Sequence, residues 1–418
     1  MKINKHCFPN GLRLVHYEDT STQMVALNIV YDVGARDEHP EHTGFAHLFE
    51  HLMFGGSAHI PDYDTPLQLA GGENNAWTNN DITNYYLTVP KPNVETAFWL
   101  ESDRMLELAF SEQSLEVQRG VVMEEFKQRC LNQPYGDVGH LFRPLAFRVH
   151  PYRWPTIGKE LSHIEQATLD EVKSFFYRFY APNNAVLAVT GNISWDETVK
   201  LTEKWFAPIP RRNVPVRQLP QEPEQTQERR LTVERNVPLD ALFMGYHMCS
   251  REGADYYAFD ILSDILSNGR SSRLNRRLVQ EQNIFSGIDA YISGTRDAGL
   301  LQISGKPAAG VSLEQAEAAV RKELEELQRS PVDGQELEKV KNKFESTQIF
   351  GNINYLNVAT NLAWFELTGK AEDIDLEVER YRSVTTEQLH TVAQRTFCES
   401  NAVVLYLSLI HISEPTRL

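Results

Sequence analysis

The sequence contains little cysteine, and its cysteines lie far apart. Only four of the 418 residues are cysteines, and none belongs to a CxxC pair: Cys7, Cys130, Cys249 and Cys398. Proteins stabilised by disulfides usually carry more cysteines at closer spacing. We therefore expect these four side chains to be reduced and buried.

Long apolar segments and an excess of positive charge are also missing. No stretch approaches the roughly 18 apolar residues of a membrane-spanning helix, and no apolar signal-peptide core follows the charged N-terminal residues. The chain has 57 acidic and 41 basic residues, a net charge of −16. This charge disfavours nucleic acid and membranes as main partners and leaves basic peptides as attractive ligands. The composition is typical of a soluble enzyme, expected in the cytoplasm.

The chain contains a weak internal repeat. Residues 168–189 align with residues 385–406 at a constant offset of 217 residues, and both copies have the pattern of a helix, a turn and a strand. Each half also has an earlier strand followed by a helix with an apolar stripe. The repeat indicates a duplicated chain, with chance similarity of helix and strand patterns as the alternative.

A proline-rich segment separates the two halves. Residues 207–230 hold five prolines and many charges, which favours an extended, exposed linker. We therefore predict two similar domains, residues 1–215 and 216–407. Residues 408–418 resemble translated cloning sequence and are set aside as a non-native tail.

Strands and helices are mixed along both halves without strict βαβ alternation, which favours the α+β class. The patterns predict strands over 25–33, 82–89, 241–248 and 300–305, and helices over 44–54, 94–108, 112–129, 196–205, 256–267, 313–329, 333–350 and 358–368.

The most informative motif is His47-Leu-Phe-Glu50-His51. Two histidines at i and i+4 lie on one face of a helix, so both imidazoles can reach one ion. Glu50, three residues after His47, projects from the same face. The order H-x-x-E-H is typical of inverted zincin hydrolases; the alternative is a helix with two surface histidines. Apolar residues on the other faces would bury the rest of this helix: Phe45, Leu48, Phe49, Leu52 and Met53.

The second half lacks this motif. When the apolar stripes of the two halves are aligned, Asp260, Ser263 and Asp264 stand opposite the two histidines and the glutamate. The second copy keeps the stripe without the imidazoles, so we expect a scaffold domain that does not bind zinc in this way.

Catalytic zinc usually takes three protein ligands, so a third ligand is needed. The predicted helix over 112–129 offers Glu124 and Glu125, with Val121, Val122 and Phe126 as its expected buried face. Glu125 lies closer to that face, where a carboxylate needs a partner. Glu124 lies nearer solvent, and the alternative is that both glutamates are solvated.

Here the chain resembles the pitrilysin family of zinc peptidases, in its short subfamily with subunits like those of mitochondrial processing peptidase. The resemblance covers nearly the whole chain to about residue 407. It consists of the HxxEH motif at 47–51, the segment Gln-Arg-x-Val-Val-x-x-Glu-Phe at 118–126, and the GG…NAxT segment at 71–78. It implies two similar α+β domains that close like a clamshell around a peptide.

The resemblance also implies roles for individual residues. His47, His51 and Glu125 look like the ligands of one Zn²⁺ per chain, because the family's glutamate ligand directly precedes an apolar residue, here Phe126. Glu50 looks like the general base. The segment Asn75-Ala76-Trp77-Thr78 resembles an edge strand that pairs with substrate backbone; an ordinary turn and short strand is the alternative.

Two positions depart from the family pattern. The family often has a glutamate seven residues before its ligand glutamate, and this chain has Gln118, an uncharged neighbour of the metal site. Many active members also have an Arg and a Tyr, seven residues apart, in the second half. Arg296 is a candidate, but residue 303 is Ile and the nearest tyrosine is Tyr291.

The predicted function is therefore that of a zinc-dependent endopeptidase, with Glu50 as general base, acting on peptides or unfolded segments. Because the Arg/Tyr pair is not evident, the alternative is a non-catalytic or partner-dependent subunit of a two-chain peptidase, and we expect a homodimer or a heterodimer with a related chain. A zinc hydrolase for a non-peptide substrate is a third possibility, which the edge-strand segment disfavours.

Overall fold

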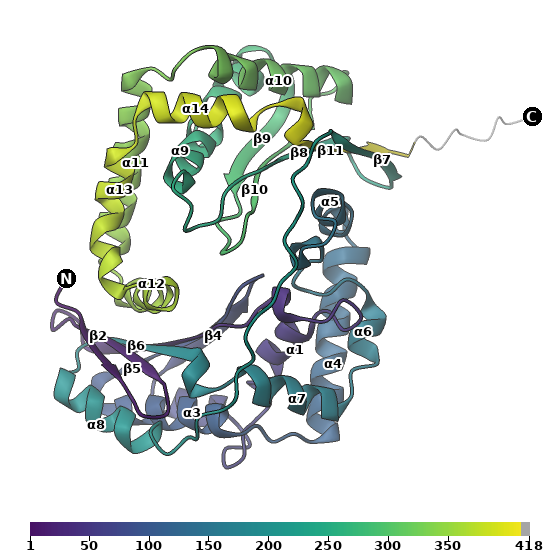
Figure 1. The fold of residues 1–418 in the computed structure, drawn as a ribbon. Coiled ribbons are helices and arrows are strands. Elements are labelled where there is room, and N and C mark those ends of the chain that lie inside the picture. The colour runs from purple at the N-terminus through teal and green to yellow at the C-terminus, as the bar shows by residue number, and fades with distance from the viewer. Residues whose placement is uncertain (411–418) are drawn as a thin grey trace, which may run out of the picture. The chain divides into compact units, whose positions relative to one another are not determined.

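The computed structural model describes residues 1–410, which form two compact units (Figure 1). Unit 1 contains residues 1–128, 150–220 and 347–377, and unit 2 contains residues 129–149, 221–346 and the described residues from 378 onward. The sequence predicted two continuous domains, whereas each compact unit includes a segment from the other half of the chain. The boundary between unit 2 and unit 1 falls within helix α11 (Gly334–Gly351).

Unit 1 is built on a six-stranded mixed sheet. β2 and β6 run parallel, whereas the other neighbouring strands are antiparallel. β4 forms one edge of the sheet. In spatial order the strands are β1 (Asn4–Cys7), β2 (Arg13–Glu18), β6 (Ala185–Gly191), β3 (Met24–Tyr31), β5 (Thr83–Pro90) and β4 (Glu73–Thr78).

Helices cover both faces of this sheet. One face packs against α12 (Tyr355–Thr368), a helix from the second half of the sequence, through a buried cluster that includes Val30, Val186, Val358 and Leu362 (Figure 1). The other face forms the larger core with the remaining helices. These are α1 (Phe45–Leu52), α2 (Asp64–Leu69), α3 (Val94–Leu106), α4 (Glu112–Phe126), α6 (Leu161–Glu165), α7 (Leu169–Phe179) and α8 (Trp195–Trp205).

Unit 2 is built on a five-stranded sheet with one parallel pair, β7 and β11. In spatial order its strands are β7 (Arg229–Arg235), β11 (Ala402–Leu409), β8 (Ala241–His247), β10 (Leu300–Pro307) and β9 (Phe285–Ile292). Its helices are α5 (Val138–Ala146), α9 (Tyr256–Ser267), α10 (Leu313–Arg329), most of α11, α13 (Glu377–Ser383) and α14 (Thr386–Thr396).

The two units share one strand topology, as the internal repeat predicted. The order β2-β6-β3-β5-β4 in unit 1 corresponds to β7-β11-β8-β10-β9 in unit 2, and in both the first pair is parallel and the others antiparallel. Equivalent elements begin 217 residues apart: Met24 and Ala241, Thr83 and Leu300, Leu169 and Thr386, and Ala185 and Ala402. The predicted α+β class with two similar domains is confirmed.

The proline-rich linker has no regular structure before β7 begins at Arg229, but two of its arginines are anchored. Arg212 donates to the carbonyl oxygens of Tyr180 and Leu106 at 2.6 and 2.7 Å. Arg217 donates to the carboxylate of Asp37 at 2.5 Å. The linker is therefore extended but partly fixed to unit 1, where the sequence predicted exposure throughout.

Two further expectations need correction. β11 extends to Leu409, which pairs with Arg235, so the strand continues two residues past the predicted domain end at 407; residues 411–418 of the proposed tail lie outside the described residues. All four cysteines are free, but only Cys130 is buried, and Cys7 is exposed.

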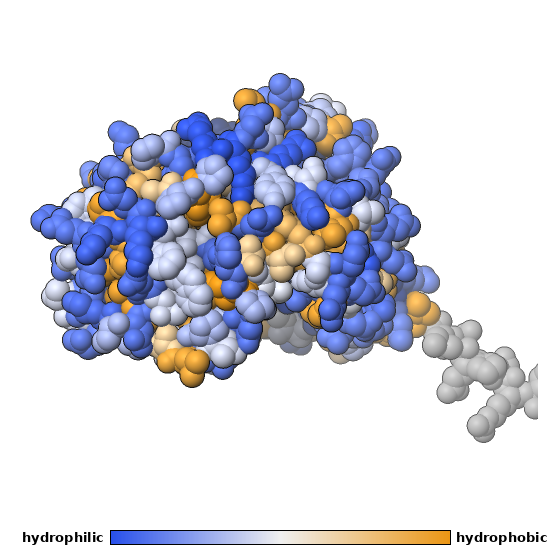
Figure 2. Space-filling view, turned by 90° about the horizontal axis from the view of Figure 1, so that it is seen from below, coloured by the Kyte–Doolittle hydropathy of each residue, from blue (hydrophilic) through white to orange (hydrophobic). Residues whose placement is uncertain are grey.

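One face of the molecule illustrates how polar and apolar side chains are distributed on the surface. The face drawn in Figure 2 shows hydrophilic side chains with smaller apolar patches between them. Within residues 1–410, no helix combines the length and the apolar character that a membrane crossing requires.

Candidate metal centre

Helix α1 buries the apolar side chains that the sequence predicted. None of these five is more than 6% exposed: Phe45, Leu48, Phe49, Leu52 and Met53. The histidine and glutamate side chains occupy the remaining face, where His47 is buried and Glu50 and His51 are partly exposed. The apolar spacing thus fixes the direction in which the HxxEH side chains point.

Helix α4 packs beside α1 and supplies a carboxylate. The side chain of Ser111 caps its N-terminus by accepting from Ser114 N–H at 3.0 Å. Its buried residues are Leu115, Val122 and Phe126. Val121, predicted to be buried, is 47% exposed, because it lies about 100° around the helix from Val122.

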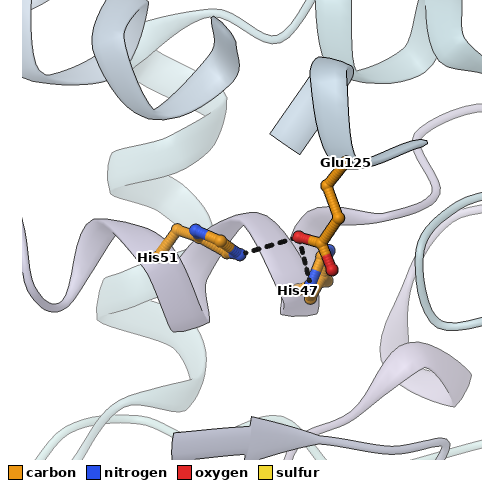
Figure 3. Close-up of side chains that lie close together, drawn as sticks. All are labelled: His47, His51 and Glu125. Carbon is orange, nitrogen blue, oxygen red and sulfur yellow. Dashed lines mark ion pairs between the residues drawn. The ribbon is translucent and has the colours of Figure 1, made fainter. Parts of the chain in front are cut away.

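The two glutamates of α4 have different environments. Glu124 is 63% exposed and forms an ion pair with Lys127 at 2.6 Å. Glu125 is only 20% exposed and points toward α1, where its Oε2 lies 3.3 Å from His51 Nε2 and 3.5 Å from His47 Nε2 (Figure 3). Of the two candidates from the sequence, Glu125 is the one that reaches the histidines.

The spacing of these three side chains suits a tetrahedral metal ion. One ligand atom from each lies within 4.8 Å of the others, and among the described residues this is the one such group of three. Ligands about 2.1 Å from a tetrahedral zinc ion stand about 3.4 Å apart, close to the 3.3 and 3.5 Å found between histidine nitrogen and carboxylate oxygen. The donor set therefore fits zinc.

Glu50 lies beside buried tyrosines. Burial raises the pKa of the Tyr85 and Tyr180 phenols, and the negative charge of Glu50 raises both further. The Tyr85 hydroxyl donates to the carbonyl oxygen of Phe49 at 3.3 Å. Glu50 itself is partly exposed to solvent.

The remaining predicted residues lie nearby in unit 1. Gln118 is on α4, and a Cβ added at Gly55 would lie 3.7 Å from its amide nitrogen. Asn75, Ala76, Trp77 and Thr78 all belong to β4, the edge strand, which lies against α1. Along β4 the burial alternates, and Trp77 is 37% exposed.

One neighbour of the centre was missed by the sequence analysis. The buried carboxyl group of Glu38 accepts hydrogen bonds from Gly44 N–H at 2.9 Å and Ala46 N–H at 2.8 Å, at the start of α1. Burial raises the pKa of Glu38 to about 8, and these two hydrogen bonds oppose the rise. A signal was available: no Ser, Thr, Asp or Asn stands at the N-cap of this helix, so its first N–H groups need another acceptor.

The equivalent region of unit 2 is occupied by internal contacts. Asp260 accepts a hydrogen bond from the Tyr381 hydroxyl, and Asp264 accepts one from Asn268 at 2.7 Å. The ring of Tyr381 stacks on Phe344 with centroids 3.4 Å apart. The aligned positions thus offer no imidazole.

The second-half Arg/Tyr positions are equally unlike the family pattern. Ile303 is buried in β10, and Tyr291 lies on β9 opposite Gln302. Burial raises the pKa of Tyr291 above its usual value, and the nearby positive charge of Arg143 opposes part of this rise. No tyrosine therefore takes the expected place seven residues after Arg296.

An α+β chain with a duplicated topology and a His-His-Glu cluster on two packed helices belongs to the class of two-domain metallopeptidase-like proteins. A family model described as Insulinase (Peptidase family M16) matches residues 13–137, and one described as Peptidase M16 inactive domain matches residues 166–344. Together these matches span most of the sequence, and the chain belongs to peptidase family M16.

Its relatives are named zinc proteases. The zinc protease PqqE of Helicobacter pylori is 26% identical over 95% of this chain and 91% of its own length. The uncharacterised zinc protease YmxG of Bacillus subtilis is 25% identical, covering 96% of this chain and 98% of its own. The crystal structure of a protease from Helicobacter pylori superimposes with a TM-score of 0.91 at 26% identity, covering 97% of this chain and 99% of that one.

Proposed function

We propose that this chain is a zinc-dependent endopeptidase of the inverted zincin type, similar to the short members that resemble mitochondrial processing peptidase subunits. The observation that carries the proposal is the convergence of His47, His51 and Glu125 on one point. Two nitrogen donors and one carboxylate form a frequent ligand set of catalytic zinc, which leaves one position open for water or substrate.

His47, His51 and Glu125 would hold one zinc ion. When bound, zinc supplies Lewis-acid activation of water and polarisation of the scissile carbonyl. Glu50 projects from the same helix face as the two histidines, so it accepts the proton of the attacking water and delivers it to the leaving amine.

The edge strand β4 supports a peptide substrate over a small molecule. An edge strand presents backbone N–H and C=O groups to a further strand. Because β4 lies against α1, a peptide paired with it would run past the face that carries Glu50. Asn75 to Thr78 would then bind substrate backbone, and Gln118 would act beside the metal ligands as an uncharged hydrogen-bonding group.

The decisive experiment replaces Glu50 by Gln. This change keeps the size of the side chain and removes the base, so zinc content and peptide affinity should persist while turnover falls by roughly 10²–10⁴. Zinc is measured by elemental analysis and turnover with an unfolded peptide in the same preparations. A Glu50→Gln protein that cleaves at nearly the wild-type rate would exclude Glu50 as the proton acceptor.

A partner-dependent subunit is the second candidate. It is favoured by Ile303 standing where the family's tyrosine is expected. In that case this chain supplies the metal centre, and a related chain supplies the residues that hold substrate carbonyls.

A further inference from the structure

The metal-binding helix begins without a conventional cap. Its N-cap residue, Gly44, has φ +88° and no side chain to accept a hydrogen bond. A Cβ at this position would lie 2.6 Å from Ile164 Cδ1 and 2.9 Å from the Ile157 carbonyl oxygen, so a capping Ser or Asp does not fit. The preceding hydroxyl, on Thr43, accepts from Lys159 N–H instead.

Two N–H groups at the start of α1 are nevertheless paired, through a residue in the loop that precedes the helix. Glu38 Oε2 accepts from Gly44 N–H and Glu38 Oε1 from Ala46 N–H, at 2.9 and 2.8 Å. Glu38 is only 7% exposed. Without it, two N–H groups would be left in a buried place, which is costly because water cannot replace the lost acceptor.

The turn that carries Glu38 is itself held on the protein. Asp37 accepts from Gly34 N–H at 3.0 Å and forms an ion pair with Arg217 at 2.5 Å. The adjacent Arg36 forms an ion pair with Asp81 at 3.2 Å, and both of these side chains are buried. The carboxyl group of Glu38 therefore extends from a fixed support.

We propose that Glu38 is a positioning residue of the metal centre: by holding the first turn of α1, it sets the rotation of the helix and so the places of His47, Glu50 and His51 relative to Glu125. A helix of eight residues is not stable on its own, so its orientation depends on such contacts. Metal ligands need placement to within a few tenths of an ångström. The role rests on the proposed function, because positioning matters only if the centre binds metal.

The test compares Glu38→Ala and Glu38→Gln with the matched control Glu41→Gln. Glu41 belongs to the same loop and is exposed. Zinc affinity, measured by competition with a chelator, should weaken by about 10–100-fold in Glu38→Ala. It should weaken less in Glu38→Gln, which keeps one acceptor oxygen, and stay at the wild-type value in the control. At saturating zinc, kcat should fall while KM stays unchanged.

A second readout does not involve metal. In the metal-free proteins, amide hydrogen exchange at Gly44 and Ala46 should be faster in both Glu38 variants and unchanged in the control. Folded variants with wild-type zinc affinity and wild-type exchange would overturn the proposal, and if Glu38→Ala does not fold, Glu38→Gln decides by the same two measurements. Wild-type protein that binds no zinc would instead reject the proposed function, and the exchange rates would still decide whether Glu38 holds the helix.

Discussion

Three side chains from two helices form the candidate centre, so the contribution of each can be tested separately. Replacing His51 by Ala leaves two ligands, and two ligands rarely retain zinc. We expect the His51→Ala and Glu125→Ala proteins to lose the metal, and Glu124→Ala to keep it, because Glu124 is paired with Lys127 at the surface. Zinc per chain is measured after dialysis. Stoichiometric zinc in His51→Ala would refute the assignment, and loss in Glu124→Ala alone would select the other carboxylate.

The residues of the centre could be predicted where the helical period of the sequence determines the direction in which a side chain points. The i, i+4 spacing put His47 and His51 on one face, and the apolar stripe of α1 fixed which face it was. On α4 the same reasoning was partly wrong: the buried stripe runs through Leu115, Val122 and Phe126, and Val121 is outside it. The missing cap at Gly44 signals that the start of α1 needs another acceptor, but the sequence does not show that Glu38 is that acceptor, because the contact depends on the conformation of the loop between them.

At the scale of elements, prediction succeeded for long periodic segments and failed for several short strands. Helices α9 and α10 have the predicted bounds. Four strands were missed: β1, β2, β7 and β9. Three of them lie at sheet edges, and β7 begins at the end of the segment that was predicted to be an exposed linker. The packing of α12 on the unit 1 sheet was missed for another reason: its sequence shows an apolar face, but not which sheet covers that face.

Helix α10 offers a pH-dependent test of how an element is held. Glu317 accepts hydrogen bonds from Arg230 of β7 and from the Tyr406 hydroxyl of β11, which tie α10 to both strands, and a third from Arg321 of α10 itself. Burial opposes ionisation of this carboxyl group, but the hydrogen bonds outweigh it and lower its pKa from 4.5 to about 2. The stabilisation is therefore complete above pH 4.5 and is lost as the pH falls toward 2.

We expect Glu317→Gln to lower the free energy of unfolding by about 1.5–3 kcal/mol at pH 7, the usual value of hydrogen bonds to a charged group. The deficit should shrink as the pH is lowered from 4.5 toward 2. Urea unfolding at several pH values measures it. The control Glu314→Gln, three residues earlier and exposed, should change stability much less than Glu317→Gln. If the loss of unfolding free energy in Glu317→Gln does not vary with pH, the negative charge of Glu317 does not stabilise the protein.

Strand β4 can be tested by removing one backbone donor. The N–H of Ala76 is bonded to the side-chain oxygen of Asn75 at 2.8 Å, so a paired peptide must displace that contact. Ala76→Pro removes the donor, and we expect KM for an unfolded peptide to rise about tenfold, equivalent to one lost hydrogen bond of about 1.4 kcal/mol. Zinc content should stay constant, and Ala76→Gly, which keeps the N–H, should resemble the wild type. An unchanged KM in Ala76→Pro would mean that the substrate does not pair with β4 at Ala76.

At the scale of the whole molecule, the duplication separates scaffold from chemistry. The two units share strand order and spacing along the chain, because the apolar pattern that builds a sheet and its helices was kept in both. The HxxEH positions were not kept: in unit 2 their counterparts include Asp260 and Asp264, which are engaged with Tyr381 and Asn268. The shared apolar pattern made the repeat recognisable in the sequence. The missing second HxxEH motif led to the expectation of a single metal centre.

The same asymmetry leads to a prediction about assembly. Unit 2 has no imidazoles at the aligned positions, and no tyrosine stands at position 303, so we expect the chain to act as a dimer, either with itself or with a related chain that carries the substrate-holding residues. Light scattering of the purified chain gives its mass, and an unfolded-peptide assay of that sample gives its activity alone. A heterodimeric peptidase would show weak activity that rises when the related chain is added. Full activity from a strict monomer would instead mean that unit 2 of this chain binds substrate without help.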